Sequence, residues 1–466
     1  MKKRILALND KTMKTKAIVH IMSKNRMNSG AFKADIDAME ELYDKYGINT
    51  IIFYKGEKID YLNIIEKLEK YGVYTVNYAN KQDLLEKIKE EDEKFEILFV
   101  YTAVELMIKT ANYLRQELGL VVSDYPDIFR DKSIQRKLLQ ENNPELGIKF
   151  VKGEPDKLDI NYIEKEIGYP FIMKPVNGVQ SSGVGKIDKK SDFFKYIENY
   201  KEFHDRLKAR GLENKEIIVE EFIDGNLYTL DYFVTPTGKV IFSKPAQEIL
   251  GIDFGFNDYC VVARVASKKV EDDLEGSGLE KFIKDTVKAC KIKNTFVHHE
   301  FKLTSKGKLK TIELNGRFGG GRVDLFKEAY DMNLFEMLLD PNIHPGELKQ
   351  NNIVFNICAS KRGKLIGIDE KIFEAIKKRP TVVATNFDKS FVGKETGLTK
   401  DGFTKMGTIK LLSLDLEQIT KDFDYIKGKY KKLLIIKSKE ELIEERKKNK
   451  KGFFGTLKEI LGGERR

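Results

Sequence analysis

The stretch FVHHEFKLTSKGKLKTIELNGRFGGG, residues 296–321, predicts two short strands joined by a turn at residues 305–307. The first strand carries Glu300, and the second carries Glu313 and Asn315. Because side chains alternate between the two faces of a strand, Glu313 and Asn315 point the same way. If the hairpin pairs in register, Glu300 lies beside them, and two carboxylates and an amide oxygen converge.

A convergence of carboxylates favours a bound cation. At an effective dielectric near 20, two carboxylates a few ångströms apart repel by roughly 4 kcal/mol. A hard divalent cation removes that penalty, and oxygen ligands suit magnesium that bridges phosphates. Arg317 follows at the rim, and the glycines at 319–321 allow the backbone to approach a ligand closely. The alternative is a surface hairpin with ordinary charges, since acidic residues are common in strands.

Composition indicates a soluble globular protein of two or three domains, with 466 residues, 41% hydrophobic and 33% charged. No apolar run approaches the ~18–20 residues that span a bilayer. The first apolar segment is interrupted at Asn9 and Asp10, which makes it too short for a secretory signal. The cysteines, Cys260, Cys290 and Cys358, form no CxxC pair, so neither a zinc site nor a disulfide framework is expected. We therefore expect a reducing, cytoplasmic compartment.

The net charge of +10 is concentrated at the C-terminus. Residues 446–466 contain eight basic and two acidic residues, a net +6, so the rest of the chain carries only about +4. No nucleic-acid-binding motif is visible, and we expect no nucleic-acid partner. The tail at 441–466 has the spacing of a basic amphipathic helix, a candidate for contact with a membrane surface or a partner protein. The alternative is that it packs on its own domain.

Residues 17–122 alternate strand-like and helix-like segments, which predicts a small parallel sheet covered by helices. The expected strands are 17–22, 49–54, 73–78 and 96–101, and the expected helices are 31–46, 60–71, 81–92 and 103–118. The loop 23–30 lies where open sheets bind ligands. It lacks GxGxxG, and it is either a substrate contact or a simple connection.

The stretch YPFIMKPVNGVQSSGVGKI, residues 169–187, is the second informative segment. FIMK predicts a strand, and Pro175 restricts Lys174 to extended geometry. The loop that follows offers glycines, two hydroxyls and backbone N–H groups, which together cradle phosphates, with the lysine as a point charge. It is not a Walker A loop. The alternative is a β-hairpin with a flexible turn.

The remaining segments complete the expected chain order. Before that stretch we expect a linker at 123–131, a helix at 132–140, a strand at 148–151 and a helix near 158–167. After it we expect a charged helix within 191–214, a hairpin at 217–234 that turns at Asp224-Gly225, a mobile loop between two strands within 242–267, helices at 277–290 and within 322–340, a β-rich subdomain at 350–440 and a helix at 438–451.

Four of these stretches, in this order, resemble the ATP-grasp superfamily, and most closely its carboxylate–amine ligases. They are RDK (130–132), PFIMKP with SSGVG (170–185), IIVEEFIDG (217–225) and the opening stretch. The resemblance covers roughly residues 17–440. It implies an α/β fold class: an N-terminal pre-ATP-grasp α/β domain (1–123), a two-lobed α+β ATP-grasp domain (124–345), a β-rich C-terminal subdomain that completes it (346–440), and the tail.

The resemblance also implies a role for each of several individual residues. The ATP phosphates would be contacted by Lys132 and Lys174, and covered by a lid that includes Gln180, Ser181, Ser182 and Gly183. The adenine edge would be lined by Glu220, Glu221, Phe222 and Ile223. One or two Mg²⁺ ions, with Mn²⁺ as an alternative, would be held by Glu300, Glu313 and Asn315. The catalytic groups would be Arg317 and Lys174.

The sequence departs from the family pattern at Leu227, where members often place a glutamate that holds the ribose hydroxyls. Ribose binding must differ here, or Asn226 substitutes. Two further arginines, Arg264 and Arg322, are candidate clamps for a substrate carboxylate, because a guanidinium pairs with a carboxylate through two hydrogen bonds. Each is equally a candidate for a surface arginine or a structural ion pair.

The activity that the resemblance implies is ADP-forming ligation of a small-molecule carboxylate to an amine, through an acyl phosphate, with an amino acid or peptide as substrate. Because family members are often dimers, the resemblance also implies that this chain forms a homodimer. Two alternatives stay open: carboxylation with bicarbonate, as in biotin carboxylase-like members, and a non-catalytic ATP-binding regulator.

Overall fold

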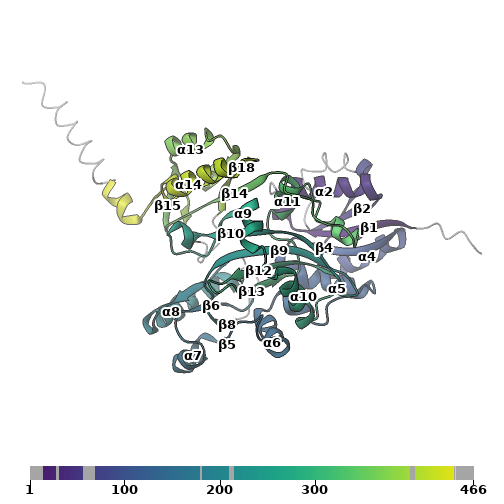
Figure 1. Cartoon of the computed structure of the whole chain (residues 1–466), viewed down its shortest axis with the longest axis horizontal. Coiled ribbons are helices and arrows are strands. Elements are labelled where there is room, and N and C mark those ends of the chain that lie inside the picture. Colours follow the sequence, from purple (N-terminus) through teal and green to yellow (C-terminus); the bar gives the residue numbers. More distant parts are fainter. Residues whose placement is uncertain are drawn as a thin grey trace, which may run out of the picture. The chain divides into compact units, whose positions relative to one another are not determined.

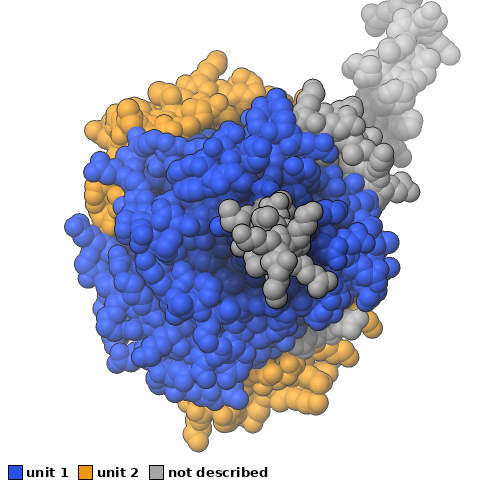
Figure 2. Space-filling view, turned by 90° about the vertical axis from the view of Figure 1, so that its right-hand side faces the viewer, with its two compact units in different colours: residues 1–148, 223–245, 274–349 blue, residues 149–222, 246–273, 350–466 orange. Residues whose placement is uncertain are grey.

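The computed structural model describes residues 14–27, 31–55, 69–178, 181–208, 215–398, 405–445 and 447. The chain forms two compact units, coloured differently in Figure 2. Unit 1 comprises residues 1–148, 223–245 and 274–349, and unit 2 comprises residues 149–222, 246–273 and 350–466. The chain therefore passes between the units repeatedly, and each unit is assembled from stretches that are distant in sequence.

Unit 1 begins with the expected parallel sheet (Figure 1). Its strands are β1 (Thr15–Met22), β2 (Asn49–Lys55), β3 (Val73–Tyr78) and β4 (Phe95–Thr102), in the order β3-β2-β1-β4. All neighbouring pairs are parallel. The prediction of a parallel α/β sheet from the alternation of strands and helices is therefore confirmed.

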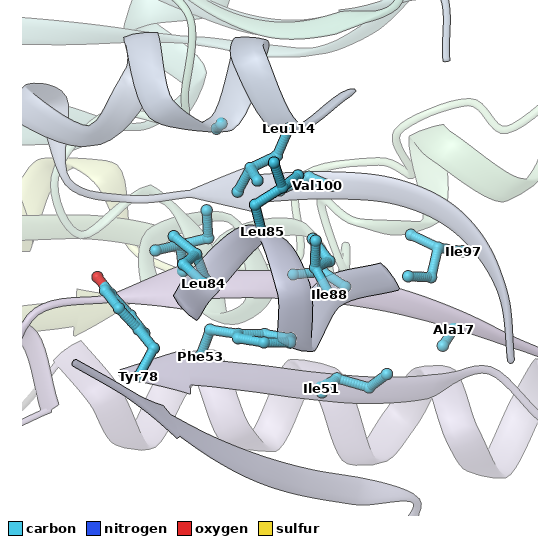
Figure 3. Packing of buried hydrophobic residues seen from close by; sticks show 13 residues of the cluster. Ala17, Ile51, Phe53, Tyr78, Leu84, Leu85, Ile88, Ile97, Val100 and Leu114 are labelled. Carbon is cyan, nitrogen blue, oxygen red and sulfur yellow. The ribbon is translucent and has the colours of Figure 1, made fainter. Parts of the chain in front are cut away.

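Helices cover both faces of this sheet because consecutive strand residues point to opposite sides. On one side, Ile51 and Phe53 pack with Leu84 and Ile88 of α4 (Lys81–Lys94) and with Leu114 of α5 (Ile108–Glu117), as Figure 3 shows. On the other side, α2 (Ala31–Tyr46) packs its apolar residues against Ile52 and Tyr54. Strands buried on both faces explain the nearly continuous apolar runs in the sequence.

The rest of unit 1 contains an antiparallel sheet. Its strands are β13 (Leu309–Asn315), β12 (Thr295–Leu303), β9 (Asn226–Val234) and the first part of β10 (Val240–Leu250), in that order. The other helical elements are α1 (Lys24–Met27), η1 (Glu69–Tyr71), η2 (Glu105–Met107), η3 (Pro126–Phe129), α6 (Lys132–Asn142), α10 (Leu279–Ala289), α11 (Arg322–Tyr330) and α12 (Glu336–Leu339).

Unit 2 contains a four-stranded antiparallel sheet, β5 (Phe150–Gly153), β8 (Ile217–Glu221), β6 (Phe171–Pro175) and β7 (Gly185–Ile187), in that order. With η4 (Pro155–Lys157), α7 (Ile160–Glu166) and α8 (Lys190–Lys208) it forms an apolar core around Ile163, Phe171, Met173 and Val219. The hairpin of β6 and β7 places the residues of the predicted phosphate loop between two paired strands.

The remainder of unit 2 adds two sheets. The larger continues from the end of β10 through β11 (Val261–Ala266), β14 (Asn351–Cys358), β18 (Lys405–Ser413) and β16 (Val382–Phe387). The smaller has the order β17 (Glu395–Thr396), β15 (Gly363–Ile368) and β19 (Leu434–Lys437). The helical elements are η5 (Gly251–Phe254), α9 (Lys268–Leu274), α13 (Glu370–Lys377), η6 (Lys389–Phe391) and α14 (Leu416–Leu433).

The predicted hairpin at 217–234 is wrong. β8 and β9 belong to different sheets and do not pair with one another. Between them Gly225 adopts a φ of 84°, and an added Cβ there would lie 2.0 Å from the Leu303 carbonyl oxygen. The Asp224 carboxylate accepts hydrogen bonds from Ser305. The Asp-Gly turn is therefore fixed on the β12–β13 turn, and it lets the chain change sheets instead of folding back on itself.

The C-terminal region, predicted from the sequence to be β-rich, also contains helices. Residues 350–440 include the helices α13 and α14 between their strands. α14 is 18 residues long, and its buried side chains Ile419, Ile426, Tyr430 and Leu433 recur at helical spacing. Within 242–267, where a mobile loop is predicted, residues 251–254 form η5, and Phe254 and Phe256 are buried against Tyr430.

The predicted basic tail lies almost entirely outside the described residues, because the structure describes nothing beyond 447. The helical pattern expected from residue 438 is present at 439–445. Within the described ranges, no helix has both the length and the apolar character required to cross a membrane.

Asp422 of α14 is expected to stabilise unit 2. Its buried carboxylate accepts hydrogen bonds from the Thr381 N–H (3.0 Å) and hydroxyl (2.8 Å) and from Arg379 Nε (2.7 Å). Burial alone would raise the pKa of Asp422, but the bonds from Thr381 and Arg379 outweigh it and hold the pKa below its usual value. We expect Asp422→Asn to lower the free energy of unfolding by about 2 kcal/mol.

The pH dependence of that effect follows from the sign of the pKa shift. A carboxyl whose folded-state pKa is depressed stabilises the fold above its unfolded pKa, and this stabilisation is lost as pH falls through the folded-state pKa. In urea unfolding, the difference between wild type and Asp422→Asn should be constant near neutral pH and shrink below about pH 4. A difference that grows on acidification would contradict the assigned bonds.

Candidate active site

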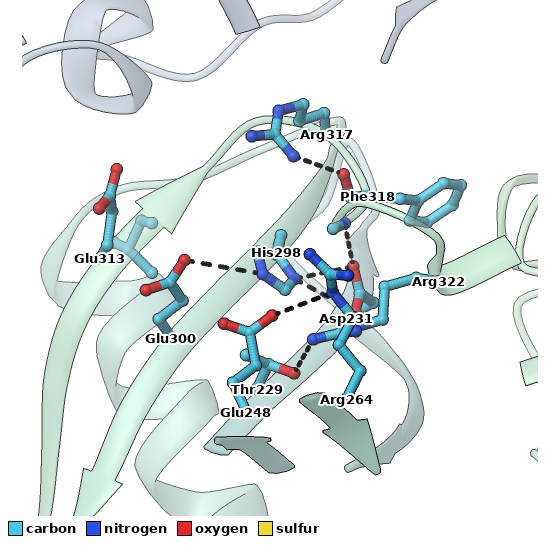
Figure 4. Close-up of polar contacts among 12 residues, drawn as sticks. Thr229, Asp231, Glu248, Arg264, His298, Glu300, Glu313, Arg317, Phe318 and Arg322 are labelled. Carbon is cyan, nitrogen blue, oxygen red and sulfur yellow. Dashed lines mark hydrogen bonds and ion pairs between the residues drawn. The ribbon is translucent and has the colours of Figure 1, made fainter. Parts of the chain in front are cut away.

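The predicted hairpin at 296–321 is confirmed, and its acidic residues face one another. In the antiparallel ladder of β12 and β13, Glu300 pairs directly with Glu313, and His298 pairs with Asn315. Directly opposite residues lie on the same face of the sheet, and so do residues two apart on one strand. Glu300, Glu313 and Asn315 therefore share one face, as the sequence predicted. Figure 4 shows Glu300 and Glu313 beside one another.

The oxygens of this set fit a hard divalent cation. The side chains of Glu300 and Glu313 keep 23% and 20% of their surface exposed, whereas Asn315 is buried. The Asn315 Oδ1 atom has no hydrogen-bond partner in the described structure, which is costly for a buried acceptor unless a ligand supplies the contact. Two carboxylates and an orphaned amide oxygen are donors that magnesium accepts. The described ranges contain no group of three or more His, Cys, Asp or Glu residues that could hold a metal ion. Glu300, Glu313 and Asn315 fall outside that definition because one of the three is an amide.

Lys132 and Glu313 form an ion pair within unit 1. Lys132 is the first residue of α6, where Asp131 caps the helix by accepting the Ser133 N–H. Its Nζ atom lies 3.0 Å from Glu313 Oε1, and its side chain is only 8% exposed. The structure thus brings one predicted phosphate-contacting lysine to one predicted metal-binding carboxylate.

Arg317 is held in place by Glu105, a residue that the sequence analysis missed. Arg317 Nη2 donates to Glu105 Oε2 at 2.9 Å, and Arg130 Nη1 lies 2.5 Å from the other oxygen, Oε1. Burial lowers the pKa of Arg317, but Glu105 more than compensates and raises it overall. The Arg317 Nε atom is buried without a hydrogen-bond partner among the described residues. Arg317 is therefore a fixed cation with one donor unused.

A second missed group, Asp231 and His298, lies on the same sheet face. In the β9–β12 ladder, Asp231 pairs with His298 and Thr229 pairs with Glu300. His298 Nδ1 lies 3.1 Å from Asp231 Oδ1, while Nε2 lies 3.8 Å from Glu300 Oε1 (Figure 4). The imidazole therefore bridges a fully buried carboxylate and a predicted metal ligand. A buried ring bonded to a carboxylate is the kind of support that orients such a ligand.

Arg322 and Gly319 complete the surroundings of Asp231. Arg322, at the start of α11, is fully buried and lies 3.5 Å from Asp231 Oδ2 through Nε, and it donates to Thr229 at 2.9 Å. The Gly319 N–H donates to Asp231 at 2.9 Å, and a Cβ on Gly319 would lie 2.4 Å from the His298 ring. Of the roles left open for Arg322, the structure therefore favours a structural ion pair.

The predicted phosphate lysine of unit 2, Lys174, forms a buried ion pair. Lys174 on β6 and Glu220 on β8 are both buried, and Lys174 Nζ lies 2.7 Å from Glu220 Oε2. In the loop that follows, Ser182 is buried, and Ser181 and Gly183 have φ angles of 57° and 74°. The Gly183 carbonyl accepts the Tyr196 hydroxyl at 2.6 Å. Gln180, predicted for the same lid, lies outside the described residues.

The predicted adenine edge uses several of its polar groups within the protein. Glu221 accepts the Lys149 N–H at 2.8 Å through its side chain, and the Phe222 N–H donates to the Pro170 carbonyl at 3.3 Å. In unit 1, the Ile223 carbonyl accepts Lys302 Nζ at 2.8 Å. Leu227, at the position where the family pattern has a ribose-binding glutamate, is buried.

Arg264, the other candidate clamp, lies on the sheet of unit 2. It pairs with Glu248 in the β10–β11 ladder, and its Nε atom lies 3.6 Å from Glu248 Oε1. Its Nη1 atom donates to Asn356 at 3.3 Å, and its side chain is 18% exposed. These contacts do not test whether Arg264 binds a substrate carboxylate, so that role stays a prediction.

Comparison with known proteins agrees with this architecture. Residues 167–324 match the model of the ATP-grasp domain. The chain therefore carries an ATP-grasp domain, and its fold, with an N-terminal parallel α/β sheet and antiparallel sheets, is the ATP-grasp fold. The resemblance to the ATP-grasp superfamily, inferred from four sequence motifs, is confirmed.

The relatives by sequence include D-alanine–D-alanine ligase B of Clostridium perfringens, which is 30% identical over 185 residues, 38% of this chain and 55% of that protein. The chain spans 55% to 63% of the length of the curated relatives that it matches.

Solved structures match over most of the chain. An L-amino acid ligase from Bacillus licheniformis aligns with a TM-score of 0.63 at 19% identity, covering 92% of this chain and all of that one. N5-carboxyaminoimidazole synthetase from Staphylococcus aureus, in complex with ADP, aligns with a TM-score of 0.59 at 15% identity, covering 90% of this chain and 98% of that one. At these identities the matches establish the fold.

Proposed function

We propose that this protein is an ATP-dependent, ADP-forming carboxylate–amine ligase that acts on an amino acid or peptide. The observation that carries the proposal is the pairing of Glu300 with Glu313 beside the orphaned oxygen of Asn315, with Arg317 fixed near the end of the same strand. Support also comes from the curated relatives named as D-alanine–D-alanine ligases and from the L-amino acid ligase of like fold.

The chemistry starts from a carboxylate, which is a poor electrophile. Transfer of the γ-phosphoryl group of ATP to it gives an acyl phosphate and ADP, and attack by an amine then gives an amide and phosphate. Magnesium would supply charge neutralisation for the phosphates. It would be held by Glu300, Glu313 and Asn315.

The protein's own groups would position the reactants and stabilise charge. Lys132 and Lys174 would each contact phosphate oxygens, exchanging part of their contact with a carboxylate for a phosphate. Arg317 would stabilise the charge that develops on the acyl carbon's oxygens, because Glu105 fixes its guanidinium and one donor is unused. His298 would orient Glu300.

The direct test is release of phosphate and ADP from ATP and magnesium in the presence of amino-acid and dipeptide panels. The proposal expects release that depends on both a carboxylate and an amine, with an amide product detected by mass spectrometry. Release that requires bicarbonate in degassed buffer would instead support carboxylation. Tight ATP binding without ADP formation under any panel would support a regulator and contradict the ligase.

Lys174 provides a prediction for nucleotide binding. Replacing it with methionine removes the cation that would pair with a phosphate, so ATP binding should weaken by about 10- to 100-fold. The measurement is isothermal titration with a non-hydrolysable ATP analogue. Lys152→Met is the matched control, since Lys152 lies on β5 of the same sheet with a 36%-exposed side chain paired to Glu216. Equal affinities for the two variants would remove Lys174 from the nucleotide site.

A further inference from the structure

Two of the three cysteines of the chain meet in unit 2. In the antiparallel ladder of β11 and β14, Ala263 pairs with Phe355. The ladder ends at this pair, and the same register continued three residues further, to the residue just before β11, would set Cys260 opposite Cys358. Cys260 is also the main cause of the lowered pKa of the Cys358 thiol, through a side-chain hydrogen bond, as expected of two neighbouring thiols. Both side chains are buried, with 4% and 5% of their surface exposed.

This placement suits a covalent bond between the two sulfur atoms. Residues directly opposite one another in an antiparallel pair have Cα atoms about 4.5–5.5 Å apart. Disulfides join cysteines whose Cα atoms lie about 4.4–6.8 Å apart. A pair in this register therefore falls within the range of separations that disulfides join.

The surroundings of Cys358 favour its thiolate, which is the reactive form of cysteine. The hydrogen bond from Cys260 lowers the pKa of Cys358; burial opposes this, and Lys405, which pairs with Cys358 in the β14–β18 ladder, lowers it further. The backbone at this point is fixed, since the Cys358 N–H donates to the Tyr430 hydroxyl at 2.8 Å.

Cys290 provides an internal contrast. It is fully buried in unit 1, and burial raises the pKa of its thiol to about 12. A thiol that stays protonated at neutral pH is a poor nucleophile. Of the three cysteines, Cys358 is therefore the one whose surroundings favour a first reaction with an oxidant, and Cys260 is placed to resolve it.

Cys260 also closes a loop. The Gly251 N–H donates to the Cys260 carbonyl at 2.9 Å, so the segment between them returns to its starting point. Phe254 and Phe256 of that segment pack on Tyr430 of α14. These contacts are non-covalent. A bond from Cys260 to β14 would fasten the end of the loop to the sheet.

We propose that Cys260 and Cys358 are a reversible oxidation site, at which a peroxide converts the two thiols into a disulfide that fastens the loop 251–260 to β14. The Cys358 thiolate attacks a peroxide oxygen, the O–O bond breaks, and a sulfenic acid and hydroxide form. Cys260 sulfur then attacks the sulfenic sulfur, the S–O bond breaks, and water leaves with the Cys260 proton. One hydrogen peroxide and two thiols give one disulfide and two waters, and a dithiol reductant reverses the step.

The test oxidises the folded full-length protein with hydrogen peroxide at low protein concentration and counts thiols after denaturation. We expect three thiols to fall to one, with a loss of about 2 Da per chain and recovery after dithiothreitol. Tryptic digestion should then give a linked pair of peptides, residues 240–264 and 350–361, while Cys290 stays free in the peptide 289–291. Peptide mapping of the wild type needs no variant and is unaffected by any folding defect of a mutant.

Variants and hydrogen exchange complete the test. Cys290→Ser should form the linked peptides as the wild type does, whereas Cys260→Ser and Cys358→Ser should not. Amide exchange in residues 251–260 should slow in the oxidised protein and return to its former rate on reduction. Three intact thiols after oxidation, a link to Cys290, a bond between chains, or unchanged exchange in the presence of the linked peptides would overturn the proposal.

Discussion

Replacing Glu313 with glutamine is expected to lower ATP-dependent phosphate release by more than about 100-fold, because outer partners of metal ligands alone typically contribute 10- to 100-fold. Glu313 faces Glu300 across the β12–β13 ladder and lies 3.0 Å from Lys132, so the substitution removes the charge of a proposed metal ligand together with the partner of a proposed phosphate-binding lysine. Glutamine keeps the shape and one oxygen. The loss would therefore report charge rather than packing.

The matched control is Glu280→Gln. Glu280 lies in the first turn of α10 in unit 1 with a 73%-exposed side chain, paired across one helical turn with Lys284, and its substitution should leave turnover unchanged. Thermal unfolding adds a readout that does not need turnover: the stabilisation by an ATP analogue with magnesium should largely disappear in Glu313→Gln. Equal turnover in Glu313→Gln and wild type would remove this carboxylate from the site.

The part of the site that could be predicted from sequence is the part that local rules determine. Alternation along one strand placed Glu313 and Asn315 on one face, and the turn residues fixed the pairing that adds Glu300. At the turn, Gly307 has a φ of 70° and donates to the Thr304 carbonyl. These features depend on residues close together in sequence, so they could be inferred without any tertiary information.

The missed residues depend on contacts between distant segments. Glu105, in a short 3₁₀ helix, joins the candidate site because Arg130 and Arg317 both reach it. Asp231 lies in an apolar strand, and a buried charge there needs a partner. That partner is His298, 67 residues away in the sequence. Sequence alone could have marked Asp231 as unusual without identifying what satisfies it.

Two errors in the fold have different causes. The Asp224-Gly225 turn was read as a hairpin because the local signal is the same whether the following strand folds back or joins another sheet; only the contact with Ser305 decides between them. α14 was missed although the spacing of Ile419, Ile426 and Leu433 is helical. That signal was present, and short strands on either side obscured it.

Replacing Asp231 with asparagine is expected to be the most destabilising of these substitutions. Its carboxylate is fully buried and accepts the Gly319 N–H and contacts His298 and Arg322, which are themselves buried. Removing the charge leaves the Arg322 cation without this counterion. The Gly319 N–H and the His298 ring then contact a neutral amide in place of a carboxylate. Breaking a buried pair of this kind typically costs about 3–5 kcal/mol.

For a unit of this size, that loss corresponds to a fall in the unfolding midpoint on the order of 10 °C. The matched control is Asp285→Asn, which breaks the Lys281–Asp285 pair one helical turn apart on the surface of α10 and should cost less than about 0.5 kcal/mol. Because the Asp231 contacts lie within the protein, the difference between the variants should persist without ATP or magnesium. A difference that appears only with both ligands would instead assign Asp231 to the metal site, since the carboxylate would then act through Glu300 and not through the packing of Arg322.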